Sequence, residues 1–218
     1  MVFENIKAVI FDLDGTLVDS MNMWADIDEK FLLEYGVDKP EGFSEAVKKM
    51  TLNEAPEFFN KYIFPPLEVD FIKQRIYELA EDFYRNSVEI KEGVFELFDY
   101  LDNENIPFCI VTATYTFLAN VVITRLNFEK RSKFLLTPID ISETCNKRSP
   151  EIFQVACEKL GVPPENTLVV EDSLHCIQAA KQAGCKTVGV YDSFSDEDWQ
   201  EIKNTADCNI LSLKDLLK

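Results

Sequence analysis

Short apolar runs alternate along this chain with segments of helical periodicity, and this alternation limits the available folds more than any other feature. A continuous apolar run rich in β-branched residues suits a strand that is buried on both faces, as in a parallel sheet. Repeated strand–helix units predict an α/β protein with a doubly wound, Rossmann-like parallel sheet. The predicted strands are 8–11, 108–111, 134–136, 168–170 and 187–190.

Helical signals fill three of the spaces between these runs. Apolar residues recur at helical spacing after Gly93, over 152–160 and over 177–183. Gly161 and Gly184 follow the last two segments, and glycine is a common residue just past a helix end. These segments are therefore predicted to be the connecting helices of βαβ units.

The segment 16–87 differs from the rest because it holds no convincing strand. Apolar residues share one helix face over 23–31 and again over 72–83. We therefore predict a helical cap at 16–87, inserted into an α/β catalytic core formed by 1–15 and 88–218. Open α/β sheets bind ligands at the carboxyl ends of their strands, and the cap is expected to lie over that edge.

The composition fits a folded protein with an acidic surface. Of the 218 residues 46% are hydrophobic, and the formal net charge is −17. The first value is enough for a packed core, and the second makes nucleic acids and anionic lipids poor partners. No apolar stretch approaches membrane-spanning length, and the first residues do not resemble a signal peptide.

The six cysteines are scattered and include no CxxC pair. Most lie in apolar segments, where cysteine behaves as a small hydrophobic residue. This usage predicts a reducing, cytoplasmic location with neither a disulfide framework nor a structural zinc site.

Four groups of polar residues follow the predicted strands or precede a helix. Asp12 and Asp14 come directly after the first strand, and residues two apart in an extended chain point the same way. Thr112 ends the second strand, Lys147 precedes a helix, and Glu171–Asp172 follow the fourth strand. Taken singly, each group has a simple structural interpretation: an acidic turn, a helix cap, a solvated lysine or a second cap. Together they supply paired carboxylates, a hydroxyl and a cation.

This set, in this order, resembles the haloacid dehalogenase superfamily of phosphotransferases. Its motifs read here as DLDGT at 12–16, Thr112 after its strand, Lys147 in K-x-x-P, and EDSLHCIQAAKQAG at 171–184. The resemblance covers nearly the whole chain, including the helical cap. It is closest to the branch that contains β-phosphoglucomutase and many small-molecule phosphatases, and it does not specify a substrate.

The resemblance implies a role for each group in phosphate chemistry. Asp12 looks like the nucleophile that forms an aspartyl-phosphate, and Asp14 resembles the general acid/base. Thr112 and Lys147 would hold the phosphoryl oxygens of a small-molecule phosphate substrate.

The resemblance also implies Mg²⁺ as the cofactor. The ion would bind the Asp12 carboxylate, the Asp14 backbone carbonyl and Asp172, with Glu171 bound directly or through water. An all-oxygen ligand set suits Mg²⁺, which would offset the repulsion between nucleophile and phosphate.

A Mg²⁺-dependent phosphatase is therefore the expected function, with two alternatives. A sugar phosphate mutase of the β-phosphoglucomutase type would need an arginine-containing cap loop, and the comparable stretch Lys48–Glu54 has none; Arg75 and Arg85 fall in a helical pattern instead. A non-catalytic regulatory protein on the same fold would be expected to lose catalytic residues that this chain keeps. Substrate and oligomeric state stay open.

Two further residues have no assigned role. Arg148 stands where relatives often have proline, and His175 is the single histidine. We interpret His175 as structural or merely exposed, because Asp14 already fills the acid/base role.

Overall fold

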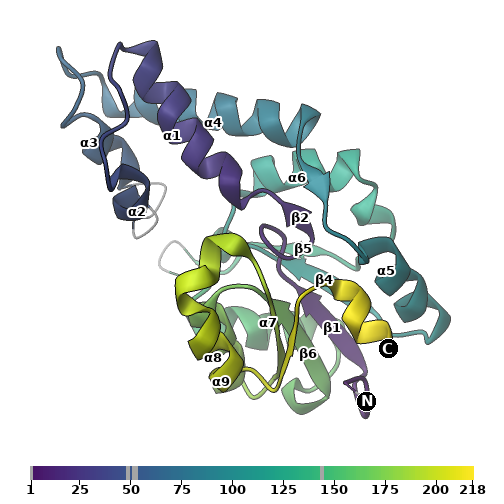
Figure 1. Ribbon diagram of the computed structural model, residues 1–218. Helices are drawn as coiled ribbons and strands as arrows, with labels where there is room; N and C mark the ends of the chain where they lie inside the picture. The colour runs from purple at the N-terminus through teal and green to yellow at the C-terminus, as the bar shows by residue number, and fades with distance from the viewer. Residues whose placement is uncertain (1, 48–49, 51–53, 143–144) are drawn as a thin grey trace. The chain divides into compact units, whose positions relative to one another are not determined.

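A computed structural model describes residues 2–47, 50, 54–142 and 145–218. The chain divides into two compact units (Figure 1): the core unit, Met1–Asp19 with Glu89–Lys218, and the helical unit, Ser20–Val88. The prediction that a cap at 16–87 covers the active site stays a prediction. Within the described ranges, no helix is both long and apolar enough to span a bilayer.

The core unit is built on a six-stranded parallel sheet with the strand order β5-β4-β1-β6-β7-β8. This sheet confirms the predicted α/β fold, and β1 lies in the interior between β4 and β6. The strands are β1 (Ala8–Phe11), β4 (Phe108–Val111), β5 (Leu135–Leu136), β6 (Thr167–Glu171), β7 (Lys186–Val190) and β8 (Cys208–Ile210).

Helices connect these strands, as the βαβ pattern predicts. The helices of the core unit are α5 (Val94–Asn103), α6 (Thr116–Arg125), α7 (Pro150–Leu160), α8 (Leu174–Gln182) and α9 (Trp199–Thr205). Short 3₁₀ helices lie at Phe128–Lys130, Pro138–Asp140, Pro164–Asn166, Ser193–Asp198 and Leu213–Leu217.

Both faces of the sheet are covered, and β1 shows how. Successive side chains of a strand point to opposite faces. Ile10 belongs to a buried cluster that includes Phe153 of α7, whereas the ring centroid of Phe11 lies 5.7 Å from that of Phe98 of α5. Helix packing on both sides explains why the strands are continuous apolar runs rather than alternating ones.

Three short strands depart from the sequence predictions. β2 (Val18–Asp19) and β3 (Glu89–Ile90) pair antiparallel, so 16–87 begins with a strand where none was predicted. β8 adds a further parallel strand beside β7. Each has two or three residues, which is too short for a periodic apolar signal, so partner strands rather than local sequence decide these elements.

The helical unit packs around aromatic side chains. Phe59 lies with its ring centroid 5.2 Å from that of Phe31 and 4.9 Å from that of Phe43. Its helices are α1 (Met21–Glu34), α2 (Phe43–Val47), α3 (Ala55–Phe59) and α4 (Val69–Asn86), and the predicted helical faces over 23–31 and 72–83 fall on α1 and α4.

Both arginines of the helical unit lie on α4 and form ion pairs. Arg75 donates to Glu34 at 2.6 and 2.9 Å and also to Glu78, and Arg85 pairs with Glu81. The stretch Lys48–Glu54, compared above with the arginine loop of mutases, lies outside the described residues except for its Met50 and Glu54.

Candidate active site

The candidate site lies at the carboxyl ends of the central strands of the core sheet. Phe11, the last residue of β1, is in register with Val170 of β6. Asp12 follows directly, and its backbone N–H donates to the Val170 carbonyl at 3.0 Å. Thr112 follows β4 and Glu171 ends β6. The parallel register therefore brings these residues, distant in sequence, to one edge of the sheet.

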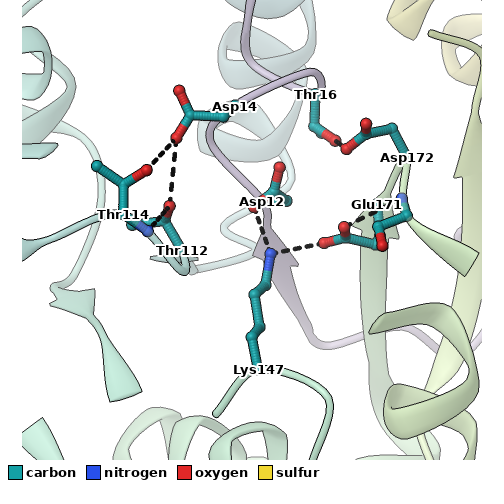
Figure 2. Close-up of polar contacts among 9 residues, drawn as sticks. Asp12, Asp14, Thr16, Thr112, Thr114, Lys147, Glu171 and Asp172 are labelled. Atoms are coloured by element: carbon teal, nitrogen blue, oxygen red, sulfur yellow. Dashed lines mark hydrogen bonds and ion pairs between the residues drawn. The ribbon is translucent and has the colours of Figure 1, made fainter. Parts of the chain in front are cut away.

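Three carboxylates and one ammonium group are buried together at this edge (Figure 2). Asp12, Glu171 and Asp172 each offer an oxygen within 4.8 Å of the other two, and they are 5%, 2% and 3% exposed. Lys147, also buried, donates to Glu171 Oε2 at 2.7 Å and forms an ion pair with Asp12. When all four groups are ionised, three negative charges and one positive charge leave a formal charge of −2.

Burial and mutual repulsion raise the proton affinity of this carboxylate cluster. Burial raises the pKa of Asp12 well above its ordinary value, and repulsion from Glu171 adds to the effect. Burial likewise raises the pKa of Asp172 to about 8, with further repulsion from Glu171 and Asp192. For Lys147, burial lowers the pKa, but Asp12 and Glu171 together outweigh it and raise the pKa well above the usual value. The lysine thus stays charged and offsets part of the negative charge of the carboxylates.

Lys147 reaches this cluster from the loop that precedes α7. The helix begins at Pro150, a residue suited to a first turn because it has no N–H to satisfy. The Ser149 hydroxyl caps the same turn by accepting from the Glu151 N–H at 3.3 Å. The neighbouring Arg148 is exposed, and so is His175 of α8. Of the two adjacent cations, only Lys147 contacts the buried carboxylates.

The turn after Asp14 passes close to Asp172. Gly15 has a φ of +87°, and a Cβ on it would lie 2.7 Å from the Asp172 Cγ. Both the backbone conformation and the available space therefore require glycine at this position. The hydroxyl of Thr16, which is fully buried, donates to Asp172 Oδ1 at 3.2 Å. The DLDGT motif thus positions Asp172 as well as supplying two aspartates.

Asp14 points toward two threonines rather than toward Lys147 (Figure 2). The Thr114 hydroxyl donates to Asp14 Oδ2 at 2.7 Å, and the Thr112 hydroxyl donates to the same oxygen at 3.4 Å. The sequence predicts that Asp12 and Asp14 point the same way, as residues two apart do in an extended strand. The chain bends at Leu13, however, so this alternation does not apply to the two aspartates. Asp12 and Asp14 share an edge of the sheet but have different partners.

Thr114 is a site residue that the sequence analysis did not identify. It is buried, and its backbone N–H donates to the Thr112 hydroxyl at 3.1 Å. Its hydrogen bond to Asp14 is shorter than that of Thr112. A detectable signal existed, because two hydroxyl residues spaced by one position follow a buried strand, but Thr112 alone matched the family motif.

A second ion pair adjoins the acidic cluster and was also not predicted. Lys91 Nζ donates to Asp192 Oδ2 at 2.6 Å, and the two side chains are 17% and 5% exposed. Lys91 follows β3, and its backbone N–H donates to the Leu17 carbonyl at 3.0 Å. After burial and Glu171, Asp192 raises the pKa of Asp172 and Lys91 lowers it. Nothing local in the sequence marks this pair, because the residues lie about a hundred positions apart.

Comparison with known proteins identifies relatives along most of the chain. A model of the haloacid dehalogenase-like hydrolases matches residues 9–190. A phosphorylated carbohydrates phosphatase from Thermotoga maritima is 26% identical over 192 residues, which are 88% of this chain and 88% of that protein. A phosphoglycolate phosphatase from Neisseria gonorrhoeae is 30% identical over 204 residues, with 88% of this chain and 83% of that protein covered.

Solved structures also share this fold. A Thermotoga maritima protein described provisionally as a β-phosphoglucomutase superposes with a TM-score of 0.83 at 24% identity, covering 97% of this chain and 98% of that one. At that identity the likeness concerns the fold alone. The matched range 9–190 includes all of the predicted site residues, from Asp12 to Asp172. The chain therefore belongs to the haloacid dehalogenase-like hydrolases, which confirms the family and the hydrolase class predicted from its motifs.

Proposed function

We propose that this protein is a Mg²⁺-dependent phosphatase that hydrolyses a small phosphate monoester through an aspartyl-phosphate on Asp12. One observation carries the proposal. Asp12 lies in a buried cluster with two further carboxylates and a charged lysine, while Asp14 is held by hydroxyls at the same edge of the sheet. This arrangement supports the proposed roles of nucleophile, proton carrier, phosphate-binding cation and metal ligands.

The donor chemistry of the cluster fits a divalent cation. Asp12, Glu171 and Asp172 offer only oxygen atoms, as Mg²⁺ prefers. The formal charge of −2 that remains after Lys147 is counted would be neutralised by one such ion. These three side chains would hold the ion, together with the Asp14 backbone carbonyl that the family motif implies. When bound, Mg²⁺ would polarise the phosphoryl oxygens and lessen their repulsion from Asp12.

The residues of this chain then supply the covalent and proton-transfer steps. An Asp12 carboxylate oxygen attacks phosphorus, the bond from phosphorus to the ester oxygen breaks, and Asp14 gives a proton to the departing oxygen. Asp14, now ionised, removes a proton from water, whose oxygen attacks the phosphorus of the aspartyl-phosphate. The bond to Asp12 breaks, phosphate leaves, and the carboxylate is restored.

Lys147 and Thr112 are proposed to bind the phosphoryl group. Lys147 already reaches Asp12 and Glu171, so a phosphoryl oxygen next to Asp12 would lie within its range. The hydrogen bond that the Thr112 hydroxyl donates to Asp14 is long, at 3.4 Å, so that hydroxyl could turn to a phosphoryl oxygen while Thr114 keeps Asp14 in place. Both groups would stabilise the charge that develops on the oxygens in the transition state.

The helical unit is proposed to act as the cap that selects the substrate. The relative from Thermotoga maritima acts on phosphorylated carbohydrates, so sugar phosphates are the first class to test. A mutase would need groups that grip a second phosphate, and the arginines of this unit are paired with carboxylates instead. Hydrolysis is therefore favoured over mutase activity.

The test is release of inorganic phosphate from a panel of sugar phosphates, nucleotides and phosphorylated cofactors, with Mg²⁺ and after removal of metal with EDTA. Phosphate release that needs Mg²⁺ is expected, with Ca²⁺ inhibitory because its longer bonds and larger ligand number disturb the attacking carboxylate. Full activity in EDTA would contradict the proposed metal.

A second assay separates hydrolysis from mutase activity. The enzyme is incubated with β-glucose 1-phosphate, Mg²⁺ and a trace of glucose 1,6-bisphosphate, and glucose 6-phosphate and free phosphate are followed separately. Free phosphate is expected to dominate. Rapid glucose 6-phosphate formation with little phosphate would assign the protein to the mutases.

A further inference from the structure

Two cysteines from different elements of the core unit are in contact, away from the candidate active site. Cys157 lies on α7, and Cys185 lies between α8 and β7; the Sγ atoms are 3.7 Å apart. Both are buried, at 2% and 5% exposure, within the same hydrophobic cluster. A disulfide needs a sulfur–sulfur distance of about 2.05 Å. The two sulfurs are therefore in van der Waals contact, and a bond between them requires an approach of less than about 2 Å.

The contact also distinguishes Cys157 from the other buried thiols. A hydrogen bond from Cys185 lowers the pKa of Cys157, although burial opposes this effect. By contrast, burial raises the pKa of Cys109 and of Cys176. Thiolate is the form that reacts with oxidants, so Cys157 is better suited to attack than these two residues.

A surface pocket lies beside Cys157. The pocket has a volume of about 330 Å³ and is lined by Gln154, Cys157 and Glu158 of α7 and by the segment 161–164 that follows the helix. Neither Cys109 nor Cys176 lines this pocket. Cys157 thus has both a second thiol in contact with it and a surface pocket beside it.

We propose that Cys157 and Cys185 form an oxidation site that reacts with hydrogen peroxide and closes a reversible intrachain disulfide. The Cys157 thiolate attacks a peroxide oxygen, the O–O bond breaks, and the hydroxide that leaves takes a proton to become water, which leaves Cys157 as a sulfenic acid. The Cys185 sulfur then attacks the Cys157 sulfur, the S–O bond breaks, and a second water forms with the Cys185 proton. Two thiols lose two electrons and two protons, and the peroxide becomes two waters.

The site is separate from the proposed catalytic residues. Cys185 directly precedes β7, and Cys157 is near the carboxyl end of α7, so both lie at the amino-terminal edge of the parallel sheet. Asp12, Glu171 and Asp172 lie at the carboxyl-terminal edge. The proposal therefore does not depend on the proposed phosphatase activity.

The test treats the full-length, native protein with hydrogen peroxide, blocks remaining thiols by alkylation, and maps disulfide-linked peptides by mass spectrometry. We expect a Cys157–Cys185 link that dithiothreitol returns to two thiols. Cys109→Ala serves as the matched control from the same hydrophobic cluster and should form the same link. Absence of the link in the wild type, or a link through Cys145 or Cys208 instead, would overturn the proposal.

Two variants test the order of the steps. Cys185→Ser should leave Cys157 as a sulfenic acid that dimedone traps, because the serine hydroxyl can still donate to Cys157 but cannot form a disulfide. Cys157→Ala should give no dimedone adduct on Cys185. Adducts of equal amount on both single variants, or an adduct on Cys185 alone, would contradict Cys157 as the attacking thiol.

Discussion

The two units of the protein differ in what they bury. Among the described residues, the core unit buries a set of polar and charged side chains that includes Asp12, Lys147 and Glu171. The helical unit buries only Ser20 and Asp28 of this kind. The helical unit instead packs aromatic rings against one another. Buried charge is costly unless it is paired or used, so this contrast supports the proposal that the core unit holds the catalytic residues.

The exposed surface of the helical unit extends the contrast. Phe64 is 95% exposed, and Leu33 and Phe71 are each 51% exposed. Single exposed apolar residues are common on proteins and carry no chemistry by themselves. The comparison predicts that substitutions at the strand ends of the core unit abolish turnover, whereas substitutions within the helical unit change stability or selectivity.

The largest effect is expected from Asp12→Asn. The amide keeps the shape of the side chain but is a poor nucleophile, so phosphate release should fall below about 1% of wild type. Asp19→Asn, a neighbouring exposed aspartate, is the matched control and should retain activity. Circular dichroism checks that both variants are folded, and substantial residual turnover of Asp12→Asn in contaminant-free protein would argue against covalent catalysis by this residue.

Lys147→Ala should be nearly as damaging, and Arg148→Ala should not. Lys147 is buried between Asp12 and Glu171, while Arg148 is exposed. Removing a preorganised charge of this kind costs about 2.7–4 kcal/mol of transition-state stabilisation, or a factor of roughly 10²–10³ in kcat. Steady-state kinetics of the two variants makes the comparison, and equal losses would show that the phosphate-binding cation lies elsewhere.

An intermediate effect is expected from Thr114→Val. The variant keeps the size of the side chain but removes the hydroxyl that donates to Asp14 at 2.7 Å. A hydrogen bond to a charged group is worth about 1.5–3 kcal/mol, so kcat should fall by roughly 10- to 100-fold while KM changes little. Thr114→Ser should restore most of the rate. A loss confined to KM, or no rescue by serine, would mean that Thr114 does not position Asp14 for catalysis.

The smallest effect on turnover, and a clear one on stability, is expected from Asp28→Asn in the helical unit. Burial raises the pKa of Asp28 to about 7 in the folded protein, from an ordinary value of 3.8. Because the folded pKa is the higher one, the contribution of Asp28 to stability is complete below about pH 4 and is lost as pH rises through about 7. The loss amounts to at most about 4 kcal/mol.

Urea unfolding at pH 5 and pH 8 tests this prediction. Asp28→Asn should stabilise the protein more at pH 8 than at pH 5, because the asparagine does not ionise. Asp26→Asn, an exposed aspartate on the same helix, should show no such difference. An equal effect of Asp28→Asn at the two pH values would indicate that Asp28 is not buried in a neutral form.

Many strands and helices of the fold could be predicted from the local sequence, because a buried element requires apolar residues in a recognisable pattern. The strands at 8–11 and 108–111 are completely buried, and complete burial requires a continuous apolar run that any reader of the sequence can find. The two-residue strands β2 and β3 and the edge strand β8 leave no such pattern, because their only requirement is a partner strand.

For the candidate site too, some features could be predicted from the sequence and others could not. Residue type and position after a strand indicated Asp12, Asp14, Thr112 and Glu171–Asp172, since the ends of parallel strands must meet at one edge. Lys147 was indicated by its place before a helix and by the family motif. Sequence could not decide how these groups pair. That Lys147 joins Asp12 to Glu171, that Thr114 is the nearer hydroxyl to Asp14, and that Cys157 meets Cys185 all depend on distances between segments far apart in the chain. Sheet register and helix packing fix those distances, so only the tertiary structure decided them.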